Sequence, residues 1–295
     1  MKLGKMFLAL LILTGPLSGF TRDKVIYGDD DRLEPYEVNG KFFDLSRSTA
    51  AMIPSDAIKE GQAGGYDIEF SPLSGRNICK DQRFANQGTA AVCSGFLVAP
   101  DVIVTAGHCV ASQSSCTDYY WVFDYALSSE GDKGYSEASN ENVYRCKKIY
   151  GQELNNTTMM DFGIVILDRP VKDRNYLTIN RDRKIADKTA VVVVGHPTGL
   201  PTKIAGGANV RDNTNEVFFS ANLDTFGGNS GSAVFNEKTG EVVGILVRGE
   251  NDYVMDESRN CQVVNKCENN GCRGEDATRI ENIKPLKAIL KERGI

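Results

Sequence analysis

The sequence predicts an all-β fold, a sandwich or a barrel, because short apolar runs recur along most of the chain. The runs are rich in β-branched and aromatic residues and are bounded by Gly, Pro, Asn or Asp, as strands joined by turns are. Almost no helical pattern lies between them, which argues against a βαβ fold. The runs are residues 95–98, 102–104, 121–123, 164–167, 191–194, 217–219 and 242–247.

One helix is predicted, at residues 283–293, with Gly294 as its stop. Residues 21–78, in contrast, are polar and irregular, and they are interpreted as a wrapping extension or a pro-segment. With 295 residues the chain can bury a substantial core. The apolar positions at helical spacing are Ile283, Leu286, Ile289 and Leu290.

The charge balance argues against a nucleic-acid partner. The formal net charge is −5 and the pI is near 5.3, whereas binding to phosphates requires clustered Lys and Arg. No basic run interrupts the sequence.

The first twenty residues have the layout of a secretory signal peptide. Lys2 and Lys5 give a positive start, residues 6–13 form a short apolar core, and residues 15–19 give a small-residue exit. The apolar core is far shorter than the roughly 20 residues of a membrane span. We therefore expect a signal peptide at residues 1–19, no membrane span, and a secreted or periplasmic protein.

A histidine and a serine, two residue types that acyl transfer uses, lie at the end of a predicted strand and in a glycine-rich turn. The chain has two histidines, and His108 ends the apolar run 102–108. Ser230 lies in a glycine-rich turn, residues 225–232. Small neighbours expose a serine Oγ and let backbone N–H groups converge on an oxyanion.

Chain order selects among the known arrangements of such residues. No histidine follows Ser230, which excludes the Ser–acid–His order of α/β-hydrolases. An acid–His–Ser order would need His196, but a proline turn follows it instead of a helix. The order His108, Asp161, Ser230 remains.

Three motifs surround these residues. They are Thr-Ala-Gly-His-Cys at 105–109, Asp-Phe-Gly-Ile-Val-Ile-Leu at 161–167 and Gly-Gly-Asn-Ser-Gly-Ser at 227–232. Together they resemble the histidine, aspartate and serine motifs of the trypsin/chymotrypsin-like serine peptidases, especially the bacterial glutamyl endopeptidases and V8-type proteases. Further similarities at 195–197, 234–236 and 278–280 extend the resemblance over about residues 88–295.

The resemblance implies two packed six-stranded β-barrels with the site between them, and a C-terminal helix. The peptidase domain would cover residues 88–295, after a possible pro-segment or N-terminal extension at 20–87. The expected protein is a monomeric serine-type endopeptidase that acts on proteins or peptides without a cofactor or metal.

The resemblance also assigns roles to individual residues. Ser230 attacks the scissile carbonyl, His108 transfers the proton, and Asp161 orients His108. The backbone N–H groups of Gly228 and Ser230 form the oxyanion hole. At the position of His196 relatives have a structural turn aromatic, so packing or hydrogen bonding is expected there.

Eight cysteines in an exported chain favour disulfides, although free buried thiols are the alternative. In the family, a bridge at Cys93 and Cys109 pins the loop of the catalytic histidine, contributing about 3 kcal/mol in the chain-entropy model. Cys116 and Cys146 flank strands of one expected barrel and are plausible partners. Cys79 is expected to pair with one of three late cysteines and so to tie the N-terminal segment to the second barrel. A zinc knuckle made by those three cysteines is the alternative. The late cysteines are Cys261, Cys267 and Cys272.

Four residues bear on substrate specificity. Asp224, followed by Thr225, stands six residues before Ser230, where trypsin-like enzymes have the residue on the floor of the P1 pocket. A carboxylate at this position predicts a weak preference for Lys or Arg at P1. Leu246 stands where glutamyl endopeptidases have the histidine that binds glutamate, which argues against glutamyl specificity. Arg248 lies close to the expected substrate backbone and can neutralise Asp224 or receive an acidic side chain.

An N-terminal cut is expected to mature the protein. Residues 25–32 resemble the mature start of glutamyl endopeptidases, so a cut after Lys24 is predicted. A cut near residues 75–88 is the alternative. The alternative function is an inactive protease-like protein that binds a partner through the same cleft.

Overall fold

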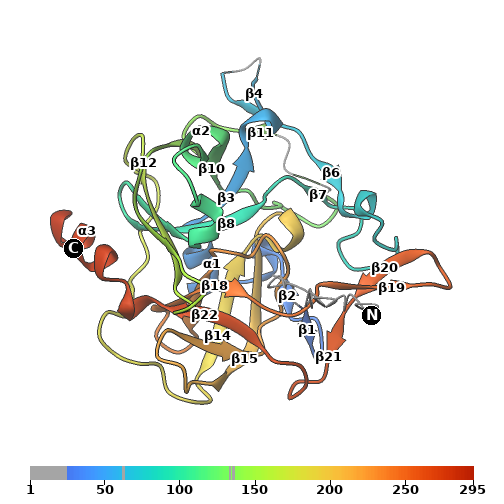
Figure 1. The fold of residues 1–295 in the computed structure, drawn as a ribbon. Coiled ribbons are helices and arrows are strands. Elements are labelled where there is room, and N and C mark those ends of the chain that lie inside the picture. Colours follow the sequence, from blue (N-terminus) through green and yellow to red (C-terminus); the bar gives the residue numbers. More distant parts are fainter. Residues whose placement is uncertain (1–24, 62–63, 133, 135–136) are drawn as a thin grey trace, which may run out of the picture.

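The computed structural model describes residues 25–61, 64–132, 134 and 137–295 (Figure 1). The predicted signal peptide, residues 1–19, lies outside the described residues. Within the described part of the chain, no helix is both long and apolar enough to cross a membrane.

The first barrel is closed by six strands in the order β10-β12-β13-β9-β8-β3. All neighbours pair antiparallel. Five of its strands follow one another along the chain, and β3 comes from farther upstream. The strands are β3 (Thr49–Pro54), β8 (Cys93–Ala99), β9 (Val102–Thr105), β10 (Tyr119–Phe123), β12 (Val143–Leu154) and β13 (Asp161–Leu167).

The second barrel has the order β14-β17-β18-β22-β16-β15, and a β14–β15 pairing closes it. A short strand, β2 (Arg32–Leu33), also pairs with β15. The predicted fold of two six-stranded barrels is thereby confirmed. The strands are β14 (Ala190–Gly195), β15 (Lys203–Asp212), β16 (Phe218–Ala221), β17 (Ala233–Asn236), β18 (Val242–Arg248) and β22 (Glu275–Arg279).

One apolar cluster joins the two barrels. It includes Phe96 and Trp121 of the first barrel and Phe235 of the second. The predicted terminal helix is confirmed as α3 (Lys284–Glu292), whose Leu286 and Leu290 are buried in the same cluster. The barrels therefore share one apolar cluster, while the second barrel has a further cluster of its own, which includes Phe219 and Leu246.

The N-terminal part of the chain is more ordered than its polar composition predicted. Residues 49–54, expected before the peptidase domain, form β3 of the first barrel, so this barrel begins near residue 49 and not at 88. The strand was missed because its sequence, Thr-Ala-Ala-Met-Ile-Pro, has small residues where apolar runs normally have large ones. β1 (Ile26–Tyr27) pairs with β21 (Lys266–Cys267).

Smaller elements complete the fold. The remaining strands are β4 (Ile58–Glu60), β5 (Tyr66–Ile68), β6 (Ser71–Pro72), β7 (Gly88–Thr89), β11 (Glu137–Ala138), β19 (Tyr253–Asp256) and β20 (Cys261–Val264). The other α-helices are α1 (Lys41–Ser46) and α2 (Ser115–Asp118). The 3₁₀ helices are Pro35–Glu37, Ser55–Ala57, Leu73–Arg76, Gly107–Val110, Pro197–Gly199 and Ile280–Asn282.

All eight cysteines lie in four disulfides, which are compatible with an extracellular location. The zinc-knuckle alternative is excluded because none of the late cysteines keeps a thiol. The pairs are Cys79–Cys261, Cys93–Cys109, Cys116–Cys146 and Cys267–Cys272.

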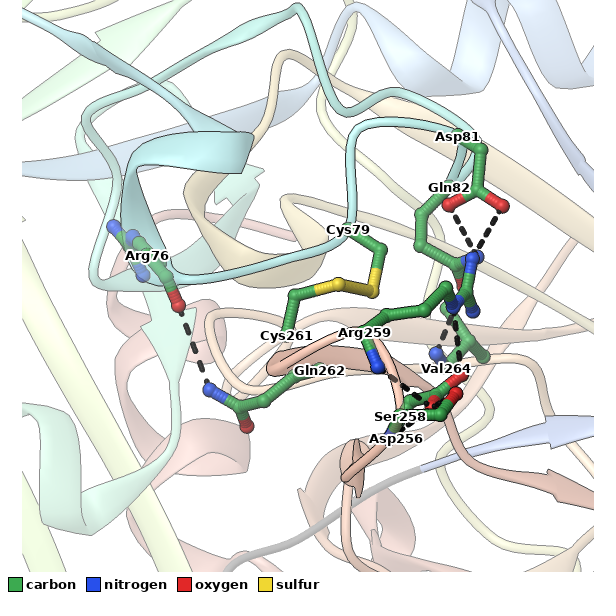
Figure 2. Close-up of a disulfide and its surroundings, with 10 residues drawn as sticks. All are labelled: Arg76, Cys79, Asp81, Gln82, Asp256, Ser258, Arg259, Cys261, Gln262 and Val264. Carbon is green, nitrogen blue, oxygen red and sulfur yellow. Dashed lines mark hydrogen bonds and ion pairs between the residues drawn. A yellow bond between two sulfur atoms is a disulfide. The ribbon is translucent and has the colours of Figure 1, made fainter.

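The Cys79–Cys261 bridge ties the N-terminal part of the chain to the β19–β20 hairpin of the second half (Figure 2). Arg259 binds Asp81 across this junction at 2.7 Å. The backbone N–H of Val264 donates to Gln82 Oε1 at 2.9 Å. The junction thus combines a covalent bond with polar contacts from both segments.

Candidate active site

His108 and Asp161 come from neighbouring strands whose register brings their ends together. Thr105, at the end of β9, pairs with Gly163 of β13. His108 follows β9 in a 3₁₀ turn, and Asp161 begins β13. The His108 Nδ1 lies 2.8 Å from Asp161 Oδ2, and the His108 backbone N–H donates to Oδ1 at 3.1 Å.

These contacts favour an ionised Asp161. Burial by itself raises the pKa of this carboxyl, but the hydrogen bonds and charge of His108, with a contribution from Arg248, bring the pKa below its ordinary value. An ionised Asp161 holds the imidazole proton on Nδ1, which leaves Nε2 as the acceptor.

Ser230 lines the same cavity as His108. The cavity has a volume of about 270 Å³ and opens between the two barrels. Ser230 belongs to the loop between β16 and β17 of the second barrel. The other lining residues are Met52, Val92, Cys93, Cys109, Tyr119, Gly227 and Gly228.

The backbone beside Ser230 presents two N–H groups. Gly228 has a φ of +92°, and a Cβ there would lie 2.5 Å from the His196 carbonyl oxygen, so the position requires glycine. Among the described residues, the N–H groups of Gly228 and Ser230 donate to no acceptor. Both are therefore available to an anionic oxygen.

The Cys93–Cys109 disulfide joins the start of β8 to the residue after His108. These two cysteines and His108 are also a group whose potential ligand atoms lie within 4.8 Å of one another. The disulfide occupies both sulfur atoms, so this group does not fit a zinc site, which needs thiolates.

His196 is fully buried and is separate from the His108–Asp161 pair. Its Nδ1 lies 3.2 Å from the Leu200 carbonyl, and its ring packs against Tyr125. Burial lowers the pKa of His196 to about 3, against the opposing effect of the Leu200 contact. The residue is neutral and packs in the interior.

Asp224 is directed toward the N-terminal segment instead of a substrate pocket. Its two oxygens accept hydrogen bonds from the backbone N–H groups of Tyr27 and Asp31, both at 2.8 Å. The neighbouring Thr225 N–H donates to the Val25 carbonyl. These contacts give Asp224 a structural role and remove the basis of the basic P1 preference that its position suggested.

Leu246 and Arg248 lie on β18, where they were expected. Leu246 is completely buried. Arg248 pairs with Asp276, with 3.3 Å between Nε and Oδ2, and its Nη1 donates to the Met159 carbonyl at 3.2 Å. Arg248 therefore contacts the loop that leads to Asp161, and its ion pair is with Asp276 rather than Asp224.

Two residues near the site were missed in the sequence. Glu275 is fully buried and accepts a hydrogen bond from Thr225 Oγ1 at 2.6 Å. The Ser94 hydroxyl donates to the Gly228 carbonyl at 2.8 Å. Glu275 is far from Thr225 in the sequence, and Ser94 lies inside a strand, so only their positions next to family motifs could have singled them out.

Comparison with known proteins identifies the family of this chain. A family model described as a trypsin-like peptidase domain matches residues 93–245, about half of the chain. The chain belongs to the trypsin-like peptidase family. It is a serine-type endopeptidase, and its substrates are peptides.

Three known proteins are similar to this peptidase at low sequence identity. An "Extracellular metalloprotease" of Bacillus subtilis (strain 168) is 28% identical over 243 residues, which cover 74% of this chain and 73% of that protein. The structure of the Vibrio cholerae VesB protease has a TM-score of 0.52 at 13% identity, covering 91% of this chain and 68% of that one. A "Glu endopeptidase in complex with MPD" has a TM-score of 0.49 at 17% identity, covering 92% of this chain and 100% of that one.

The name of the B. subtilis relative refers to a metal, and the described residues of this peptidase do not fit one. The one group with suitable spacing is the Cys93, His108 and Cys109 set, in which the disulfide occupies both sulfur atoms.

Asp224 predicts a pH dependence of stability. Burial raises its pKa to about 7 from 3.8, despite its two backbone N–H donors. Because the folded-state pKa is the higher one, its stabilising contribution is fully present below pH 3.8 and is lost as the pH rises through 7. The free energy of unfolding of Asp224→Asn minus that of wild type should therefore increase between pH 4 and pH 8, which means that the variant becomes more stable relative to wild type.

Urea unfolding at both pH values measures this difference. Asp182→Asn, which changes a side chain that is 83% exposed, is the control. A difference between Asp224→Asn and wild type that does not change with pH would contradict the prediction.

Proposed function

We propose that this peptidase hydrolyses peptide bonds through an acyl-enzyme formed on Ser230, with His108 as the general base and Asp161 as its partner. The observation that carries the proposal is the hydrogen-bonded His108–Asp161 pair at a cavity that Ser230 also lines. The available N–H groups of Gly228 and Ser230 support it further.

Each step uses one of these groups. Ser230 Oγ attacks the carbonyl carbon while its proton passes to His108 Nε2, and the carbonyl oxygen becomes an anion held by the two N–H groups. The C–N bond then breaks, and the imidazolium gives its proton to the leaving amine. In the second half of the reaction, water attacks the acyl carbonyl carbon while its proton passes to His108. The ester bond to Ser230 Oγ then breaks, His108 returns the proton to Oγ, and the carboxylic acid is released.

Ser230→Ala should abolish turnover without unfolding the protein, with a loss on the order of 10⁶ in kcat. Peptide hydrolysis and labelling by a fluorophosphonate probe measure the loss, and circular dichroism checks the fold. Ser232→Ala is the matched control, since Ser232 is a buried hydroxyl two residues away that bonds to Asn229. Wild-type protein that is folded but unlabelled would support the partner-binding alternative instead.

Substrate specificity is assigned to Glu275 rather than to Asp224. The Glu275 carboxylate lies between Thr225 and the chain after β18, because the Glu250 N–H also donates to it at 3.2 Å. The family resemblance expects these two segments to flank the P1 side chain. A cationic P1 residue would add its charge to the hydrogen bonds that Glu275 accepts from Thr225, Glu250 and Tyr27, so a preference for Lys or Arg is proposed from Glu275.

Glu275→Gln should reduce kcat/KM for P1 Arg peptides by about tenfold or more, while P1 Phe peptides change little. Asp224→Asn is the matched control and should leave the Arg-to-Phe ratio unchanged, because its carboxylate faces residues 27–31. Matched chromogenic peptides with Arg, Glu and Phe at P1 measure these ratios. Wild-type activity that is highest on Glu would refute the assignment.

We propose that export and maturation proceed as the sequence predicts. A signal peptide at residues 1–19 directs secretion, and a cut after Lys24 produces a mature chain that starts at Val25. The burial of Val25 and Ile26, both 0% exposed, supports a start here. A cut near residues 75–88 would remove β3 from the closed first barrel, which disfavours that alternative.

Edman sequencing of the secreted protein should therefore read Val-Ile-Tyr-Gly. Lys24→Gln should accumulate a longer form, because the proposed cleavage site is lost, while Lys41→Gln should mature normally. A secreted, active protein that starts at Phe20 would exclude a zymogen step.

A further inference from the structure

Ser94, in β8 of the first barrel, contacts the loop that contains Ser230 in the second barrel. Its backbone N–H donates to the Ser230 carbonyl at 2.8 Å, and its Oγ donates to the Gly228 carbonyl at 2.8 Å. The same Oγ accepts the His196 backbone N–H at 3.0 Å. Ser94 is fully buried, so water does not replace these contacts.

The Ser94 backbone is itself held in place. Thr105 Oγ1 donates to the Ser94 carbonyl at 2.7 Å. Cys93, the preceding residue, is bonded to Cys109 beside His108. A donor on Ser94 is therefore fixed relative to the general base as well as to the serine loop.

The peptide groups on both sides of Gly228 are held by hydrogen bonds. The Gly227 carbonyl, which shares a peptide plane with the Gly228 N–H, accepts from the Thr198 N–H at 2.5 Å. The Gly228 carbonyl accepts from Ser94 Oγ. In the same peptide group the Asn229 N–H donates to the Phe226 carbonyl at 2.9 Å. Glycine at a φ of +92° resists rotation less than any other residue, so these bonds, of which only that from Ser94 comes from the first barrel, restrain its conformation.

We propose that Ser94 is a positioning residue for the oxyanion hole: its hydroxyl fixes the orientation of Gly228 and so aims the Gly228 N–H at the oxyanion. The inference rests on the proposed function, because it assigns no role to Ser94 apart from that reaction. An oxyanion donor acts only when it is placed to within a fraction of an ångström, so loss of its support lowers kcat more than substrate affinity.

Ser94→Ala removes the hydroxyl alone. We expect kcat to fall about tenfold or more with KM within about threefold of wild type, because the oxyanion forms only in the transition state. The affinity for a peptide boronic acid, which presents a tetrahedral anion, should fall by the same factor as kcat. Rates are expressed per active site titrated with a fluorophosphonate, so that unfolded protein does not contribute.

Ser48→Ala is the matched control. Ser48 is 1% exposed and directly precedes β3 of the same barrel, and its Oγ also donates to a backbone carbonyl, that of Asn175. If the Ser94 hydroxyl has only a structural role, both variants should lose stability and keep the kcat of wild type. Equal kcat values for Ser94→Ala, Ser48→Ala and wild type would overturn the proposal.

Two further results separate the possible failures. If Ser94→Ala does not fold, Ser94→Thr tests the same point: it keeps the hydroxyl and should retain kcat, and a folded threonine variant with a tenfold loss would overturn the proposal. If wild type itself neither hydrolyses peptides nor reacts with the fluorophosphonate, the proposed function has failed instead.

Discussion

The pairing of β9 with β13 is the constraint on which the proposed chemistry of this peptidase depends. His108 and Asp161 are far apart in the sequence, and only the register that sets Thr105 opposite Gly163 brings the turn after one strand to the start of the other. A slip of one residue would turn Asp161 to the other face of the sheet. The geometry of the site is therefore stabilised by the entire closed barrel, in which every strand has two neighbours.

Buried polar groups outside the His108–Asp161 pair have structural roles. Asp224 accepts two backbone N–H groups, and Lys203 forms an ion pair with Glu34 at 3.0 Å while both are almost fully buried. Burial lowers the pKa of Lys203 to about 8, and the charge of Glu34 opposes this effect. Both contacts join residues 27–34 to the second barrel, and removing one member would leave the other buried without its partner.

The sequence predicted the parts of the fold in which local pattern and tertiary role agree. The runs at 164–167 and 242–247 became β13 and β18 because β-branched residues buried on both faces have no other stable arrangement. β15 was not predicted, because its Gly-Gly-Ala sequence lacks an apolar run and is a strand only through its neighbours. Family motifs named His108, Asp161 and Ser230, whereas the direction of the Asp224 side chain was decided by residues 27 and 31, which no local pattern connects to it.

The partners of β1 and β2 determine when the N-terminal segment can dock. Ile26 pairs with Lys266 and Leu33 pairs with Ile204, whereas the strands of the first barrel all lie between residues 49 and 167. During synthesis, the first barrel has all its strands before the partner of β1 has emerged. Docking of residues 26–33 is therefore a late folding event with high contact order. Any activity that requires residues 26–33 to be docked would begin only after almost the whole chain has been synthesised.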